Sequence, residues 1–280
     1  VTARIAALKG PTAMGLVKLM SDAPSSANGP LYDFTLAGSA DEVTPALIKG
    51  ELDMACVPAN LAAVLYNKTE GAVQVLAVNT LGVLYIVENG ESVQSLADLK
   101  GKTVCVGDVG SGTALNAAQV LEAYGMTFDD IKVMYDSFSG GAEALKNGQC
   151  DAAFTVSGAP TPALTDLATA YNFNMPSLSD EAVSYLTTNY PFLVQDNLPA
   201  NTYTCVADET VCVAVKAVFT ASKDLSEDVV YEITKAMFDS QSELAGAQAK
   251  FGFLSPEGAV AGSFDLHPGA EKYYKEIGVL

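Results

Sequence analysis

The sequence predicts an α/β fold made of two similar lobes, and three observations point to it. The phrase ALIKGELDMA at residues 46–55 returns in altered form as ALKNGQCDAA at 144–153, with the shared pattern Ala-Leu-x-x-Gly-x-x-Asp-x-Ala. Each copy closes an alternation of strand-like and helix-like segments, which predicts right-handed parallel βαβ units in each half. Two apolar runs, at 75–87 and 211–220, are placed to carry the chain from one lobe into the other and back.

The two halves repeat the same order of elements. Apolar and alternating runs predict strands at 5–8, 32–36, 54–57, 103–106, 131–135 and 152–156. The first strand of each half is followed by a helix, ending near Met20 in the first half and covering 114–124 in the second. The repeated helices end at Gly50 and Gly148, where a left-handed backbone conformation is favourable for glycine.

The two apolar runs also define the expected lobes. The first lobe is expected to hold residues 1–83 and 215–280, and the second residues 84–214. After the return crossing, Ser226 and the acidic residues that follow it predict the start of a helix. Two Rossmann-like lobes joined by two crossing strands predict a hinged cleft.

Charge and hydropathy limit the partners. The chain has 33 acidic and 15 basic residues and a net charge of −18, which excludes nucleic acid and anionic membrane surfaces as partners. No apolar run is long enough to span a membrane. The sequence opens directly on a strand-like run without a signal peptide, as a mature or trimmed protein would. We expect a monomer.

The residues that usually carry catalysis or bind metal are scarce. The five cysteines lack CxxC or Cys/His spacing, so we expect no metal site, no cofactor and mostly buried free thiols, with a Cys205–Cys212 bridge left open. His267, the single histidine, has no nucleophile signature near it. Asp53 and Asp151 are paired by the repeat, but an Asp at that place commonly holds turn backbone, so we expect both to be structural. No catalytic residue is predicted.

The candidate binding residues follow from the position of the strand ends. In open parallel sheets the carboxyl ends of the strands and the N-termini of the following helices face the crevice, where backbone N–H groups and hydroxyls bind small acids. The candidates at these turns, at the crossing run and in the segment PANTY are Thr12, Ser39, Asn60, Asn79, Thr80, Ser111, Gly112, Thr113, Ser137, Thr155, Ser157 and Tyr203.

Each candidate has an alternative that involves no ligand. For Thr12, Ser39 and Asn60 the alternative is helix capping, and the same applies to Thr155 and Ser157. For the GSGT turn at 110–113 the alternative is a plain strand-to-helix turn with an N-cap, and this turn lacks the spacing and lysine of a nucleotide-binding P-loop. Asn79 and Thr80 would line the cleft floor or form a polar pair at a strand edge. Tyr203 would cover the pocket or pack within its loop.

The motifs resemble two groups of binding proteins. LKGPTAMGLVKLM, LAGSADEVTPALIKGELDMACVPANLAAVLYN and VNTLGVLYIV, within residues 8–100, resemble the ABC-transporter binding proteins of the nitrate, sulfonate, taurine and thiamine-pyrimidine group. VGSGTALNAAQVLEAYG, DAAFTVSGAPTPALTDLA, LPANTYTC, SKDLSEDVVYEITKAMF and LHPGAEKYYKEIG, within 101–280, resemble the TAXI family of TRAP-transporter solute-binding proteins. The change of character near 98–102 fits a natural relative of both groups or a joined chimera.

The resemblance implies a periplasmic-binding-protein-like fold and a non-enzymatic role outside the cytoplasmic membrane. The expected partners are a small organic acid, sulfonate or pyrimidine-like ligand and the membrane subunits of a TRAP- or ABC-type importer. Arg4, the only arginine, precedes the first strand at the end away from the cleft, so an acidic ligand would be held by helix ends and hydroxyls. The alternatives are a hybrid scaffold without an evolved ligand and an enzyme on the same fold.

Overall fold

The computed structural model describes residues 2–8, 11–21, 25–26, 29–37, 40–90, 92–239, 241, 254–260 and 265–280. The chain divides into two compact units, of which unit 1 holds residues 1–81 and 216–280 and unit 2 holds 82–215. Both are α/β, so the predicted fold class is confirmed. Two long neighbouring strands, β6 (Val73–Glu88) and β11 (Thr210–Ser222), begin in one unit and end in the other, and they contain both predicted crossing runs.

Unit 1 is a mostly parallel sheet with helices on both faces. Besides its parts of β6 and β11, its strands are β1 (Ala3–Leu8), β4 (Tyr32–Ala37) and β5 (Met54–Pro58), with the short pair β2 (Ser25–Ser26) and β3 (Gly29–Pro30) apart. Its helices are α1 (Pro11–Met14), α2 (Val17–Ser21), α3 (Ala40–Ile48), α4 (Ala59–Lys68), α9 (Glu227–Asp239), α11 (Pro256–Ala259) and α12 (Pro268–Glu276).

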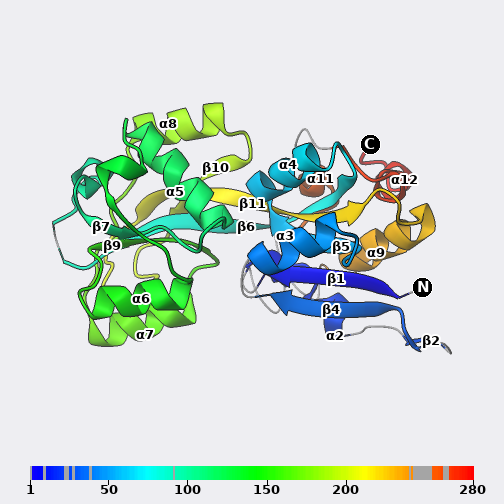
Figure 1. The fold of residues 1–280 in the computed structure, drawn as a ribbon, viewed down its shortest axis with the longest axis horizontal. Coiled ribbons are helices and arrows are strands. Elements are labelled where there is room, and N and C mark those ends of the chain that lie inside the picture. Colours follow the sequence, from blue (N-terminus) through cyan, green and yellow to red (C-terminus); the bar gives the residue numbers. More distant parts are fainter. Residues whose placement is uncertain are drawn as a thin grey trace. The chain divides into compact units, whose positions relative to one another are not determined.

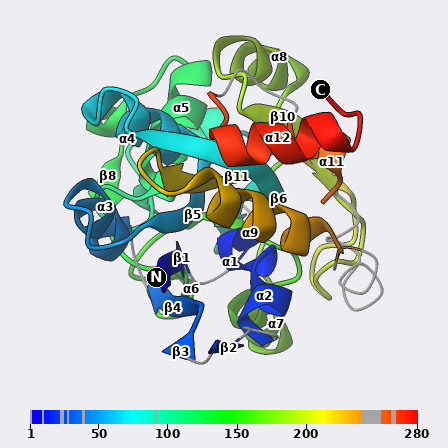
Figure 2. The ribbon, with the colours of Figure 1, turned by 90° about the vertical axis from the view of Figure 1, so that its right-hand side faces the viewer.

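The sheet of unit 1 has the order β4-β1-β5-β11. β4, β1 and β5 are parallel, and β11 returns antiparallel to β5. Alternate residues of β1 and β5, such as Ile5, Met54 and Cys56, face a core shared with α2, α9 and α12, and α3 and α4 pack against these strands as well. Figure 2 shows α9 and α12 side by side in this unit.

Unit 2 has the same design with shorter strands. Besides its parts of β6 and β11, its strands are β7 (Thr103–Cys105), β8 (Lys132–Met134), β9 (Ala152–Ser157) and β10 (Leu193–Leu198). Its helices are α5 (Gly112–Ala123), α6 (Phe138–Lys146), α7 (Pro162–Ala170) and α8 (Asp180–Asn189), with 3-10 turns η1 (Leu96–Leu99) and η2 (Phe128–Asp130).

The strand order in unit 2 is β6-β9-β7-β8, with β10 on β11. β9 is parallel to β7 and antiparallel to β6, as β5 is to β1 and β11 in unit 1. Two cores cover the faces of the sheet, one with α5 and α8 and the other with α6 and α7 (Figure 1). The middle strands β5 and β9 are therefore equivalent, and each directly follows one copy of the repeated phrase.

The repeated aspartates hold these middle strands in place. Asp53 Oδ2 accepts the backbone N–H of Arg4 at 2.8 Å, and Asp151 Oδ2 accepts that of Thr103 at 2.7 Å. Their own N–H groups donate back to the carbonyls of Arg4 and Thr103 at 2.9 and 2.8 Å. On the other side, the carbonyls of Asp53 and Asp151 accept the N–H groups of Ser222 and Asn89 at 2.9 and 3.0 Å. Both aspartates are structural, and their carboxylates bind the neighbouring strand rather than the turn.

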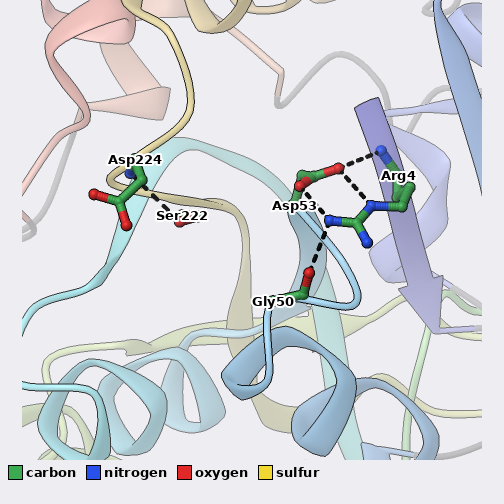
Figure 3. Close-up of polar contacts among 5 residues, drawn as sticks. All are labelled: Arg4, Gly50, Asp53, Ser222 and Asp224. Carbon is green, nitrogen blue, oxygen red and sulfur yellow. Dashed lines mark hydrogen bonds and ion pairs between the residues drawn. The ribbon is translucent and has the colours of Figure 1, made fainter. Parts of the chain in front are cut away.

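In unit 1, the side chain of Arg4 adds further hydrogen bonds to the Asp53 carboxylate (Figure 3). The residue lies inside β1 and not before it, and its guanidinium donates from Nε and Nη2 to the two oxygens of Asp53 at 2.9 and 2.7 Å. Nη2 also donates to the carbonyl of Gly50 at 2.8 Å, at the end of the repeated helix. The hydrogen bonds from Arg4 lower the pKa of Asp53. Nearby, the N–H of Asp224 donates to the hydroxyl of Ser222 (Figure 3).

The helix expected to end near Met20 is broken in two. α1 ends at Met14 and α2 begins at Val17, and the buried Gly15 lies between them. A Cβ at Gly15 would lie 2.9 Å from the Cβ of Asn79, which is closer than real contacts allow. The approach to β6 therefore requires a glycine here, and the chain changes direction at this point.

The single histidine caps the last helix. His267 is 1% exposed, and its Nδ1 accepts the N–H of Gly269 at 3.2 Å at the start of α12. Its backbone N–H donates to Val75 of β6, and Tyr274 of α12 donates to the carbonyl of Leu76 at 2.8 Å. Burial lowers the pKa of His267, and the carbonyls of residues 225 and 223 offset this only in part. Folding therefore favours the neutral form of the His267 ring.

We predict that Asp151→Ala lowers the free energy of unfolding by about 1–3 kcal/mol, because it leaves the partly buried N–H of Thr103 without its acceptor. Urea unfolding checks this. The control is Asp208→Ala at an exposed loop position, which should stay within about 0.5 kcal/mol of the parent. Equal losses in the two variants would contradict the role given to Asp151.

We predict that unfolding stability falls as the pH drops below 6.5, the ordinary pKa of histidine, in part because of His267. A lowered pKa in the folded state means that the unfolded chain binds the proton first, so the loss continues until the pH reaches the lowered value. His267→Asn keeps a capping side chain but does not titrate. Urea unfolding at pH 7 and pH 5 should show a smaller loss in the variant, and parallel losses would contradict the prediction.

Candidate functional site

The predicted residues of unit 2 gather at one edge of its sheet. β7, β8 and β9 are parallel, so their carboxyl ends lie at the same edge, and α5, α6 and α7 begin in the loops that follow. Among the described residues, this edge holds the candidates of the second half apart from Tyr203, which are Ser111, Gly112, Thr113, Ser137, Thr155 and Ser157. Thr155 and Ser157 lie within β9 itself and not in the turn after it, because this strand extends to Ser157.

The turn before α5 combines a helix cap with a close backbone approach. Ser111 is the N-cap, and its Oγ accepts the N–H of Ala114 at 3.1 Å. Gly112 and Thr113 are the first helical residues, and Thr113 is 6% exposed. Gly107 has φ +96°, and a Cβ there would lie 2.7 Å from the Cβ of Thr113. Thr113 thus packs on Gly107. The cap uses only the oxygen of Ser111, so it leaves the hydroxyl proton of that residue unused.

The N-terminus of α6 is occupied by a carboxylate of the chain itself. Ser137 is the N-cap, with its Oγ accepting the N–H of Gly140 at 3.2 Å. Asp136 Oδ1 accepts the N–H of Ser137 at 2.7 Å, and a Cβ at Gly140 would overlap the Asp136 carboxylate. A negative charge therefore already lies over this helix end, where the macrodipole favours it. An acidic ligand would meet repulsion at α6, in contrast to the expectation for Ser137.

Tyr203 connects with Ser157 through a residue that the sequence analysis missed. The Tyr85 hydroxyl lies 2.9 Å from Ser157 Oγ and 3.1 Å from the Tyr203 hydroxyl. Tyr203 is 2% exposed and its ring packs on Phe173 at 5.6 Å, so it lies in the core of unit 2 and contacts residues outside its own loop. Thr155 stands opposite Tyr85 in the pairing of β9 with β6, on the same face as Ser157.

A signal for Tyr85 was present in the sequence. In the apolar run 75–87, only three residues carry side-chain polar atoms, namely Asn79, Thr80 and Tyr85. A tyrosine buried in such a run requires a partner for its hydroxyl. Which partner it finds depends on the pairing of β6 with β9, and that pairing is not written in either segment alone.

In unit 1, two candidates meet and others do not. Asn79 Nδ2 donates to the carbonyl of Thr12 at 2.9 Å and to Cys56 Sγ at 3.3 Å, while the Thr12 hydroxyl donates to the carbonyl of Leu8 at 2.7 Å. Asn79 is 1% exposed, and its Oδ1 has no hydrogen-bond partner among the described residues. Asn60 lies buried in the first turn of α4, and its Oδ1 accepts the N–H of the next residue at 2.9 Å.

The remaining candidates of unit 1 are Thr80 and Ser39, and Thr80 does not join the contact between Thr12 and Asn79. Thr80 is buried in β6 directly after Asn79, and strand alternation points it to the opposite face. Ser39 lies outside the described residues. The described candidate binding residues of this unit are therefore Thr12 and Asn79, which contact each other, and Asn60 in the first turn of α4.

The thiols are poorly suited to nucleophilic chemistry. All five cysteines are free, and four of them are buried. Burial raises the pKa of Cys150 to about 12 and that of Cys56 well above its ordinary value, so both remain protonated at neutral pH. No group of His, Cys, Asp and Glu residues able to hold a metal ion occurs in the part of the chain that the structure describes. What the candidates supply is hydrogen-bond donors and acceptors.

We predict that Ser111→Ala lowers the free energy of unfolding by about 1 kcal/mol without any ligand, because α5 loses its N-cap. Urea unfolding measures the change. The matched control is Ser184→Ala, at an exposed position inside α8, where alanine is the better helix former and a small gain is expected. A loss at Ser184 as large as that at Ser111 would contradict the capping role.

Solved structures share this fold. The periplasmic aliphatic sulphonate-binding protein SsuA from Escherichia coli is 17% identical, with 98% of this chain and 82% of that chain covered and a TM-score of 0.56. An ABC transporter protein from Parabacteroides distasonis is 16% identical, with 100% and 79% covered and a TM-score of 0.55. The alkanesulfonate-binding protein SsuA from Xanthomonas axonopodis pv. citri, bound to MOPS, is 14% identical, with 98% and 83% covered and a TM-score of 0.52.

At these identities the likeness shows the fold, and the predicted periplasmic-binding-protein-like architecture is confirmed. No helix among the described residues is both long and apolar enough to cross a membrane. The model of the NMT1-like family matches residues 37–278 without interruption at the change of character near 98–102. The chain belongs to the NMT1-like family.

Proposed function

We propose that the protein is an extracytoplasmic solute-binding protein that captures a small organic solute and delivers it to a membrane importer. The observation that carries the proposal is that each unit holds polar side chains at or beside the carboxyl ends of its parallel strands, namely Thr12, Asn60 and Asn79 in unit 1 and Ser111, Thr113 and Ser157 in unit 2. In unit 1, the buried Asn79 Oδ1 has no hydrogen-bond partner among the described residues. The proteins with the same fold support it, since the names of two describe sulfonate binding and that of another describes an ABC transporter.

The proposed ligand is an organic acid, a sulfonate or a pyrimidine-like compound. The N-terminus of α5, with Ser111, Gly112 and Thr113, is the best place for an acidic group, because α6 already carries the Asp136 carboxylate. Arg4 is engaged by Asp53, so an arginine clamp is not part of the proposal. In unit 1, the free acceptor Asn79 Oδ1 suits an N–H or O–H group of the solute.

The proposed partner is the membrane part of an importer. The names of the structural neighbours favour an ABC system, whereas the resemblance of residues 101–280 to TAXI proteins favours a TRAP carrier. The single family match across 37–278 supports one natural lineage over a joined chimera.

Native mass spectrometry of the purified protein, before and after mild unfolding, tests the proposal. We expect a small molecule in stoichiometric amount, released on unfolding. A panel of carboxylates, alkanesulfonates and pyrimidines in a thermal-shift assay tests the empty protein. No released molecule together with no shift by any compound would contradict solute binding and favour a scaffold without a ligand.

We predict that Ser111→Ala combined with Thr113→Ala weakens the binding of an acidic ligand found in this way by about 1–3 kcal/mol, through lost hydrogen bonds. Isothermal titration calorimetry measures the affinity. Ser184→Ala on α8 is the control and should leave it unchanged. An unchanged affinity in the double variant would remove α5 from the binding site.

A further inference from the structure

Four hydroxyl-bearing residues of unit 2 form a connected chain of hydrogen bonds. The backbone N–H of Thr161 donates to the Tyr203 hydroxyl at 3.0 Å. The Tyr203 and Tyr85 hydroxyls are 3.1 Å apart, and Tyr85 lies 2.9 Å from Ser157 Oγ. Tyr85, Ser157 and Tyr203 are 1%, 4% and 2% exposed, so water does not replace these contacts. The residues come from β6, β9 and the loops after β9 and β10, up to 118 positions apart.

The first hydrogen bond, from the backbone N–H of Thr161, fixes which hydroxyl donates and which accepts in the rest of this series. A backbone N–H only donates, so Tyr203 must accept from Thr161 and use its own proton elsewhere. Its possible acceptors are Tyr85 at 3.1 Å and the Thr161 hydroxyl at 3.5 Å, and the shorter contact is the stronger one. Tyr85 then accepts from Tyr203, and the nearest acceptor for its own proton is Ser157 Oγ at 2.9 Å. Burial raises the pKa of Tyr85 well above its usual value, so its phenol keeps that proton at neutral pH.

The direction leaves one proton without an acceptor. Ser157 Oγ receives the proton of Tyr85, and no described residue makes a hydrogen bond that could take the proton of Ser157 itself. Because buried polar groups are nearly always hydrogen-bonded, this unused donor is available to an ordered water molecule or to a solute group that displaces it. Ser157 is the last residue of β9, at the carboxyl edge of the parallel strands, where the proposed solute groups gather.

We propose that Ser157 donates a hydrogen bond to an acceptor oxygen of the solute, and that Tyr85 and Tyr203 are positioning residues that hold its hydroxyl in the donor direction. This rests on the proposed solute-binding function and narrows the ligand. The group next to Ser157 is a carboxylate, sulfonate or carbonyl oxygen and not an ammonium group, because an ammonium group has no lone pair to accept with. Tyr203 therefore orients Ser157 through Tyr85 and does not cover the solute.

Neutron diffraction from crystals of the perdeuterated protein without added solute reads the direction of each hydroxyl. We expect the deuterium of Tyr203 to point at Tyr85, that of Tyr85 to point at Ser157, and that of Ser157 to point away from Tyr85. In Tyr85→Phe, the Tyr203 deuterium should turn to the Thr161 hydroxyl, its remaining acceptor. The matched control is Tyr274→Phe, which loses a buried tyrosine hydroxyl bond in unit 1 and should leave all directions in unit 2 unchanged.

A Ser157 deuterium that points at Tyr85 in the parent protein would overturn the proposal. So would a Tyr203 deuterium that already points at Thr161 before Tyr85 is changed. These directions are read without a solute, so such a result would leave the proposed function standing. The expected directions combined with an empty solute panel would instead contradict the proposed function, and with it the solute contact of Ser157, while the directions of the hydroxyl groups would stand.

Propionate and propylamine, which share a carbon skeleton, test the acceptor assignment by calorimetry. We expect propionate to bind more tightly than propylamine, and Ser157→Ala to weaken propionate by about tenfold, the effect of one lost hydrogen bond. Ser184→Ala should change neither compound. Tighter binding of propylamine, binding of neither compound, or propionate binding that is unchanged in Ser157→Ala would overturn the assignment.

Discussion

Each unit depends on a carboxylate that fastens the start of its middle strand to the parallel neighbour. Asp53 and Asp151 accept a backbone N–H of β1 and β7, and their own backbone groups bind strands on both sides. This sets the register of three adjacent strands at once. The register in turn decides where β5 and β9 end, and so which side chains stand at the carboxyl edge. The repeated phrase carries the aspartate and, before it, the glycine that turns the chain out of the helix.

The two units use this common plan with different reinforcement. In unit 1, Arg4 adds two hydrogen bonds to Asp53 and one to Gly50, which removes the only guanidinium from any role with a ligand. In unit 2, the fastening rests on Asp151 and backbone groups. With arginine absent from the edge, binding would depend on helix ends, hydroxyls and amides. That chemistry suits recognition of small polar solutes better than bond making.

The helix ends at the edge of unit 2 are not equivalent, although their sequences look alike. Ser111 and Ser137 both cap their helices, but the carboxylate of Asp136 lies across the first turn of α6. An acid would therefore be drawn to α5 and repelled from α6. On the neighbouring strand, the buried hydroxyl chain gives Ser157 a preferred direction. The edge would thus offer donors at α5 and β9 with a negative charge at α6, an asymmetry that would orient a solute in one way.

The sequence by itself determined the features that depend on neighbouring residues. The α/β class, the repeated helices ending at left-handed Gly50 and Gly148, and the caps Ser111 and Ser137 follow from local patterns, because a turn or cap is satisfied within a few residues.

Only the tertiary structure decided the contacts between distant segments. The gap between α1 and α2 contains Gly15, which lies against Asn79 of β6. The pairing of β6 with β9 brings Tyr85 close to Ser157, 72 positions away, and the packing of the loop after β10 brings Tyr203 to the same place, 118 positions away. Such partners are selected by register and packing, which no single segment encodes.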